Sequence, residues 1–156
     1  MVDPFTAKLL FTLAAAFLLR DNISKSSAEV GGESKAIAQR LRRQVVDMQR
    51  REALDVLNSA KNQYVSKANE YHRLKGEFKN RLDTLYSDIR AINELKKTLY
   101  SERRHHDIPD LKAKTNELYS VVDEVKKSFR TYGEQVREYN AAVAEIKALI
   151  ASTIGK

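Results

Sequence analysis

The sequence has 156 residues, with 28 Lys and Arg against 21 Asp and Glu, and its formal net charge at pH 7 is +7. It contains only five Gly and two Pro, too few turn-forming residues for a many-stranded sandwich, a barrel or a βαβ sheet. The absence of Cys excludes disulfide scaffolds, thiolate zinc sites and cysteine nucleophiles. This composition predicts an all-α fold, and the length favours one domain.

Residues 1–20 are apolar apart from a few side chains and are predicted to form a helix. Asp3 can cap its start, and Pro4 suits the first helical position because the amide hydrogen that proline lacks would make no hydrogen bond within the helix there. Residues 4–20 would span about 25 Å, slightly less than the roughly 30 Å hydrocarbon core of a bilayer. Residues expected to meet a membrane or an assembly are Phe5, Leu9, Leu10, Phe11, Leu13, Phe17, Leu18 and Leu19.

The sequence leaves several placements of this helix open. The helix could cross a membrane, lie in one, be buried in the bore or wall of an oligomer, or pack as an ordinary core helix against the next segment. A cleaved signal peptide is a further reading, because Ser26–Ala28 offers small residues to a protease. The long polar stretch after Arg20 favours a retained helix.

Residues 21–33 are small and polar and include Gly31 and Gly32, so they are predicted to form a flexible joint. From residue 34 onward the composition is typical of long helices. The only proline in that part is Pro109, and a helix must end close to it. We therefore expect a coiled-coil hairpin over 34–156, with arms at about 34–100 and 111–153 and a turn at 101–110.

The two arms have heptad periodicity. Alternate steps of three and four from Leu54 to Leu99 land on apolar or aromatic residues at eleven of fourteen positions, and from Leu111 to Ile150 at eleven of twelve. A sustained period of 3.5 residues predicts a left-handed coiled coil. A short connection makes the arms antiparallel, which places Tyr71 opposite Tyr139.

The predicted seam of the hairpin is made of residues from both arms. These are Tyr64, Tyr71, Phe78, Leu82, Leu85, Ile89, Ile92, Leu99, Leu111, Leu118, Val122, Val125, Phe129, Tyr132, Val136, Tyr139, Val143, Ile146 and Ile150. The first arm is longer than the second, so residues 34–56 are expected to overhang. An isolated half-apolar helix is marginal in water, which predicts packing against other copies of the chain.

Basic residues cluster just after the joint, at Lys35, Arg40, Arg42, Arg43, Arg50 and Arg51. Such a cluster suits lipid headgroups, a phosphate backbone or an acidic partner, and a solvated helix face is the ordinary alternative. No aromatic residues alternate with these arginines, so any contact with nucleic acid would be independent of base sequence.

The sequence contains no catalytic signature and no glycine-rich phosphate or dinucleotide loop. His105, His106, Asp107 and Asp110 crowd the expected tip of the hairpin, where a solvated turn is the simpler interpretation than a metal site. We expect no catalytic residues, no metal site and no cofactor. The chain is therefore predicted not to be an enzyme.

The layout of an apolar N-terminus, a small-residue joint and a long basic helix without cysteine resembles the small internal or ejection proteins of short-tailed phages. A second resemblance is local. Pro109–Ala113 with Asn116 and Leu118, followed by Tyr139–Val143, is similar to the C-terminal helices of the LemA family of membrane-anchored bacterial helical proteins.

These resemblances supply the expected function. The first implies a virion protein that moves to the host envelope and helps DNA cross it, with itself, other virion or envelope proteins, a membrane and the nucleic-acid backbone as partners. The second implies an envelope scaffold associated with a bacterial inner membrane, for which a phage spanin is the related alternative. In both cases we expect a non-enzymatic structural protein that forms a homo-oligomer.

Overall fold

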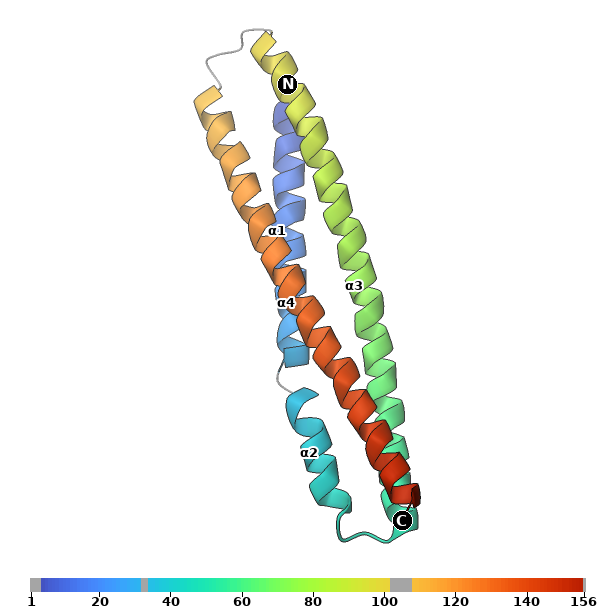
Figure 1. Cartoon of the computed structure of the whole chain (residues 1–156). Coiled ribbons are helices and arrows are strands. Elements are labelled where there is room, and N and C mark those ends of the chain that lie inside the picture. Colours follow the sequence, from blue (N-terminus) through green and yellow to red (C-terminus); the bar gives the residue numbers. More distant parts are fainter. Residues whose placement is uncertain (1–3, 32–33, 102–107, 156) are drawn as a thin grey trace. The chain divides into compact units, whose positions relative to one another are not determined.

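A computed structural model describes residues 4–31, 34–101 and 108–155 (Figure 1). This part of the chain forms four helices, α1 (Pro4–Gly31), α2 (Ser34–Val45), α3 (Arg50–Ser101) and α4 (Ile108–Gly155), and contains no strand. The all-α fold class expected from composition is confirmed. None of the helices in these three ranges has an apolar stretch long enough to cross a bilayer.

The chain divides into two compact units instead of the single domain expected from its length. Unit 1 is formed by Met1–Ser24 and Gly76–Arg130, and unit 2 by Lys25–Lys75 and Thr131–Lys156. Each unit therefore contains part of α3 and part of α4. The third helix differs, because unit 1 has most of α1 whereas unit 2 has α2 and the end of α1.

The core of unit 1 is built from one face of each of its three helices. Its buried apolar side chains are Phe5, Leu9, Leu13, Ala16, Leu19, Ile23, Phe78, Leu82, Leu85, Ile92, Leu118, Val121, Val122 and Val125. Along α1 these residues recur every three or four positions, which is the spacing of one helical face. Lys8 forms an ion pair of 2.9 Å with Asp88 on α3, and Arg20 one of 2.7 Å with Glu124 on α4.

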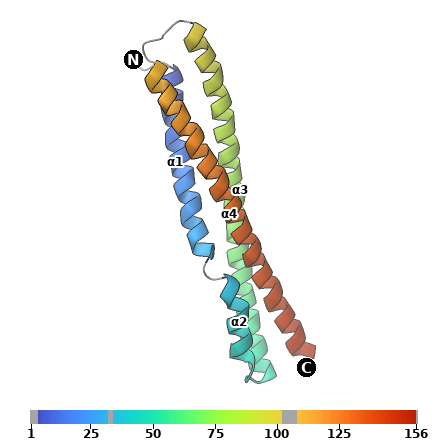
Figure 2. The same ribbon diagram turned by 60° about the vertical axis from the view of Figure 1, so that its left-hand side comes forward.

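Unit 2 has a second core, in which Ile37 and Leu41 from α2 pack with Leu57 from α3 and Ile146 from α4. Figure 2 shows α2 folded back along the beginning of α3. Half-buried residues that pack against these four are Val45, Val56, Ala60, Tyr64, Leu149 and Ile150. Burying an apolar side chain of this size contributes about 1.5–3 kcal/mol, so α2 is held by its apolar face.

The predicted joint at 21–33 differs from the structure, because α1 continues as a helix to Gly31. Ile23 and Val30 are fully buried and extend the buried face of α1 beyond residue 20. Ser27 donates a hydrogen bond of 2.5 Å to the side-chain oxygen of Gln135. Small polar residues are permitted in a helix when tertiary packing holds it, which the composition alone did not indicate. Residues 32 and 33 lie outside the described part of the chain.

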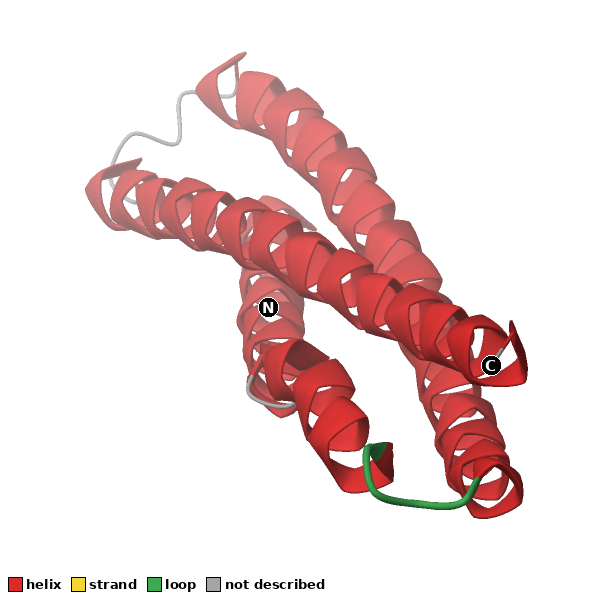
Figure 3. Cartoon of the chain, turned by 60° about the horizontal axis from the view of Figure 1, so that its bottom comes forward, coloured by secondary structure: helices red, strands yellow, loops and turns green. Residues whose placement is uncertain are grey.

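The predicted continuous arm from residue 34 to residue 100 is also wrong, because a turn at Val46–Gln49 separates α2 from α3 (green in Figure 3). The Met48 amide donates to the Val45 carbonyl at 3.1 Å within this turn. Residues 34–56 consequently do not overhang. Folding back buries Ile37 and Leu41, which would stay exposed on an extended helix, and this burial outweighs continued helix propagation.

The expected turn at 101–110 falls largely between α3, which ends at Ser101, and α4, which begins at Ile108. Residues 102–107, which include His105 and His106, lie outside the described part. Pro109 lies in the first turn of α4, where its missing amide hydrogen costs no helical hydrogen bond.

Candidate functional site

The residues predicted for the seam are all buried or half-buried wherever the structure describes their side chains; that of Leu99 is not described. Thr115 is the polar member of the stepping pattern in the second arm, and it is buried as well. Its hydroxyl donates a 2.7 Å hydrogen bond to the carbonyl of Leu111 in its own helix. The seam positions therefore supply packing, and the buried polar group is satisfied locally.

Four tyrosines form an aromatic cluster in unit 2. The ring of Tyr71 contacts those of Tyr139 and Tyr132, with centroids 5.6 and 6.3 Å apart, and Tyr64 contacts Tyr139 at 5.6 Å. All three contacts are edge-to-face, the arrangement that ring quadrupoles favour. The cluster joins α3 to α4 through these ring contacts.

Tyr132 is the most enclosed member of this cluster. Its hydroxyl donates a hydrogen bond of 3.3 Å to the backbone carbonyl of Tyr71. Burial raises the pKa of Tyr132 well above its ordinary value, and Tyr71, Glu70 and Glu29 add smaller contributions in the same direction. The phenol is consequently held in its neutral, hydrogen-bonding form at physiological pH.

The helix α1 exposes an apolar face opposite its buried face. Leu10 is 46% exposed, Phe11 78% and Leu18 57%, and Ala14 between them is exposed too. Phe17 is half-buried, and the Arg20 guanidinium lies 4.9 Å from the centre of its ring. The structure thus divides the eight predicted membrane or assembly residues between two faces, with Phe5, Leu9, Leu13 and Leu19 buried.

A small groove lies beside this exposed face within unit 1. Its volume is about 140 Å³, and it lies between α1 and α3. Its apolar lining comes from Ala15, Leu19 and Leu85, and its polar lining from Arg81, Thr84 and Asp88. A space of this size accommodates roughly one aromatic ring.

The predicted basic cluster lies around the turn between α2 and α3. Arg40, Arg42, Arg43, Arg50 and Arg51 are exposed, and the side chain of Lys35 is outside the described part. Arg50 donates a hydrogen bond to the backbone carbonyl of Ile154 at the end of α4. Among the described residues, the other four arginines form no ion pair with a carboxylate.

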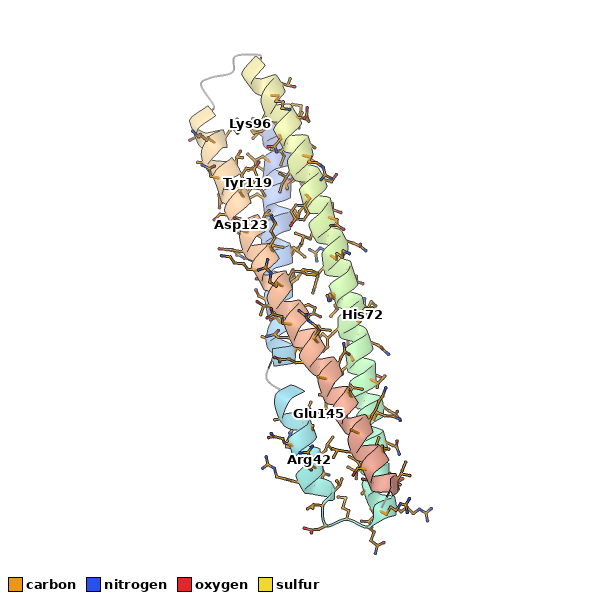
Figure 4. All side chains as sticks on the ribbon, viewed as in Figure 1. Arg42, His72, Lys96, Tyr119, Asp123 and Glu145 are labelled. Atoms are coloured by element: carbon orange, nitrogen blue, oxygen red, sulfur yellow. The ribbon has the colours of Figure 1, made fainter. Side chains whose placement is uncertain are left out.

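Arg42 and Arg50 line one groove (Arg42 is labelled in Figure 4). The groove has a volume of about 340 Å³. Its other lining residues are Val45, Val46, Met48, Ala53, Leu149, Ser152 and Thr153. Sequence reasoning missed the contribution of α4, because the break after Val45 that brings α2 beside α4 carries no Gly or Pro signal.

Within residues 4–31, 34–101 and 108–155, no group of three His, Cys, Asp or Glu is arranged to hold a metal ion. Asp110 is exposed, and its expected neighbours His105, His106 and Asp107 lie outside the described residues. His72 is exposed on α3 (Figure 4).

No protein family, curated protein or solved structure matches this chain in the comparisons with known proteins.

Proposed function

We propose that this chain is a non-enzymatic structural protein that assembles with copies of itself through the exposed face of α1. The observation that carries the proposal is the exposure of Leu10, Phe11 and Leu18 on one face of a helix whose other face is already buried. No charged residue interrupts α1 between Lys8 and Arg20. A helix that is apolar on all sides is normally buried on all sides, whereas one face of this segment is exposed.

A second copy of α1 suits this face better than an unrelated partner. In an antiparallel pair of α1 helices centred on Ala14, Phe11 of each copy lies opposite Ala15 and Leu18 of the other. Such a contact is self-complementary, as a two-fold dimer requires. The small side chain of Ala14 allows close approach at the centre. The 140 Å³ groove beside Ala15 and Leu19 provides space for the Phe11 ring of the partner.

The area involved indicates a reversible contact. Three large, largely exposed apolar side chains present on the order of 300–400 Å², which is within the size of the largest patch on a typical monomer. Stable dimers bury about 800 Å² per partner. We therefore expect assembly that depends on protein concentration.

The proposal includes a coiled-coil hairpin of α3 and α4 as the rigid part of each subunit. In unit 2, Tyr71 of α3 contacts Tyr139 of α4, and Arg50 of α3 donates a hydrogen bond to Ile154 of α4. Residues earlier in α3 therefore pair with residues later in α4, as in an antiparallel pair of helices. In unit 1, Tyr119 donates to the side-chain oxygen of Asn93 at 3.0 Å (Tyr119 is labelled in Figure 4). These pairings and the heptad stepping support an antiparallel coiled coil.

The biological setting we propose is the one that the layout of the sequence predicts. The assembly would act as a virion component that helps DNA cross a host envelope. A membrane-associated envelope scaffold is the second candidate, and it is favoured by the exposed arginines around the α2–α3 turn, which suit anionic surfaces.

The deciding experiment measures the mass of the full chain in solution across a range of protein concentrations. The double variant F11S/L18S should convert the wild-type oligomer into monomer while helicity stays unchanged, because both side chains are exposed in the single subunit. V46S is the matched control, since Val46 is an equally exposed apolar residue outside α1. A wild-type chain that stays monomeric at every concentration contradicts the proposal, as does a double variant that assembles normally.

A further inference from the structure

One end of unit 2 combines exposed apolar side chains with exposed arginines. Val46, in the turn between α2 and α3, is 72% exposed, and Ile154, at the end of α4, is 53% exposed. Arg50 links the two segments through its hydrogen bond to the Ile154 carbonyl, and the 340 Å³ groove is lined by residues of both. These two segments therefore belong to one surface, which we name the basic end: residues 40–51 and 152–155.

The charge of the basic end is strongly positive. Five arginines lie between residues 40 and 51 against one acidic residue, Asp47. All five are exposed, and within the described ranges Arg40, Arg42, Arg43 and Arg51 have no carboxylate partner. Unpaired arginines on a surface are available to phosphate groups, which they bind through two parallel hydrogen bonds.

We propose that the basic end docks the protein onto an anionic lipid surface. Val46 and Ile154 enter the interfacial region, and the arginines bind the phosphates of the headgroups around them. The contact is peripheral, since an arginine can lay its apolar stem along the acyl boundary while its guanidinium stays at headgroup level. Anionic membranes attract such clusters at close range only, so the contact requires the turn itself to touch the surface.

The exposed apolar residues decide between a lipid surface and a nucleic acid. A phosphate backbone offers no partner for Val46 or Ile154, and contacts to it come from charged and polar groups alone. The basic end also has no aromatic residue on which a base could stack. A lipid interface is the surface that uses both parts of the basic end, the arginines and the two aliphatic side chains.

This inference does not depend on the assembly proposed for α1, because the two surfaces belong to different units. The monomeric variant F11S/L18S should still bind anionic vesicles through the basic end. Failure of either proposal therefore leaves the other testable in the same preparation.

The test uses the fact that the chain has no Trp, so that a single introduced Trp reports its own surroundings. Val46→Trp in the full chain is mixed with phosphatidylcholine vesicles that do or do not contain phosphatidylserine. We expect its fluorescence to shift to shorter wavelength only with the anionic vesicles. Phe11→Trp is the matched control on the exposed face of α1, and its emission should change little on the same vesicles.

The contribution of the arginines is measured by vesicle co-sedimentation of the variant R42Q/R43Q. One basic residue near an anionic surface contributes about a factor of five in binding, so the double variant should bind roughly 30-fold more weakly. R130Q/R137Q removes two exposed arginines of α4 outside the basic end and should bind like the wild type.

Three outcomes would overturn the inference. One is the absence of a Val46→Trp shift on anionic vesicles, and another is a shift of Phe11→Trp alone, which would make α1 the lipid-facing element. The third is binding of double-stranded DNA, but not of anionic vesicles, in a manner that R42Q/R43Q abolishes. The last result would assign the arginines to a nucleic-acid backbone.

Discussion

Both units contain part of α3 and part of α4, but their third helices differ. The two third helices differ most in the residues that they expose to solvent. In unit 1, α1 buries Leu9 and Leu19 and exposes Leu10, Phe11 and Leu18. In unit 2, α2 buries Ile37 and Leu41 and exposes arginines. The inward faces follow one rule, since each helix buries an apolar stripe. The outward faces therefore separate the candidate roles, with an apolar contact in unit 1 and an anionic contact in unit 2.

The largest effects should come from the inward faces of α1 and α2, which are both buried. Leu9→Ala in α1 and Ile37→Ala in α2 should each lower the free energy of unfolding by about 2–5 kcal/mol, because both side chains are fully enclosed. Chemical denaturation of the full chain measures both. Leu10→Ala, one residue from Leu9 but on the outward face, should change stability by less than about 0.5 kcal/mol. A Leu9→Ala variant as stable as Leu10→Ala would show that α1 does not pack as described.

A pH-dependent effect is expected in unit 2, through Tyr132. Burial raises the pKa of Tyr132 in the folded state, so the folded state retains the phenolic proton above about pH 10, where the unfolded chain releases it. The folded state then binds more protons than the unfolded state. The contribution of Tyr132 to the free energy of unfolding is consequently present at neutral pH, and it falls as the pH rises above about 10.

The variant Tyr132→Phe isolates this contribution. At pH 7 it should lose about 0.5–1.5 kcal/mol, because the hydrogen bond to the Tyr71 carbonyl is removed. Above about pH 10 its urea midpoint should fall less steeply than that of the wild type. Tyr119→Phe, which removes an exposed hydroxyl from unit 1, should keep the wild-type decline because Tyr132 is still present. Identical pH profiles for Tyr132→Phe and the wild type would exclude the assigned role.

A gain in stability should come from replacing a buried hydroxyl on the inward face of α1. Thr12 is enclosed, and its hydroxyl has no hydrogen-bond partner among the described residues. Thr12→Val should raise the unfolding free energy by about 1 kcal/mol, since it replaces an unsatisfied polar group by a methyl group of similar shape. Thr115→Val is the contrasting variant, because the Thr115 hydroxyl donates a hydrogen bond to the Leu111 carbonyl. Removing this hydroxyl should therefore not raise the free energy of unfolding. Thermal melting of the two variants distinguishes them.

Much of the packing of α3 and α4 was predictable from residue spacing. The steps of three and four identified Tyr71, Tyr132 and Tyr139 as inward-facing, and the ring of Tyr71 contacts both of the others. Such a prediction works because a long heptad pattern fixes which side of a helix is apolar, whatever it packs against. The arginines after residue 40 were likewise predictable as a charged cluster, since charge is a property of composition.

The spacing of apolar residues did not predict the fold where two arrangements of the helices fit the same spacing. Ile37 and Leu41 fit an extension of α3 as well as a separate helix folded back on it, and no Gly or Pro marks the turn at Val46–Gln49. The small polar residues after Arg20 similarly fit a joint, although Ile23 and Val30 keep them helical by burial. In both places the choice depends on contacts with residues distant in sequence.

The sequence by itself determined that the protein is helical, which faces of its long helices are apolar and where its positive charge is concentrated, because periodicity and composition are local properties. The tertiary structure alone decided that α1 is buried on one side only, that α2 folds back, and that Val46 and Ile154 belong to the same surface as the arginines. The physical reason is that burial depends on which distant segments meet, and apolar surface is removed from water by whichever arrangement encloses most of it.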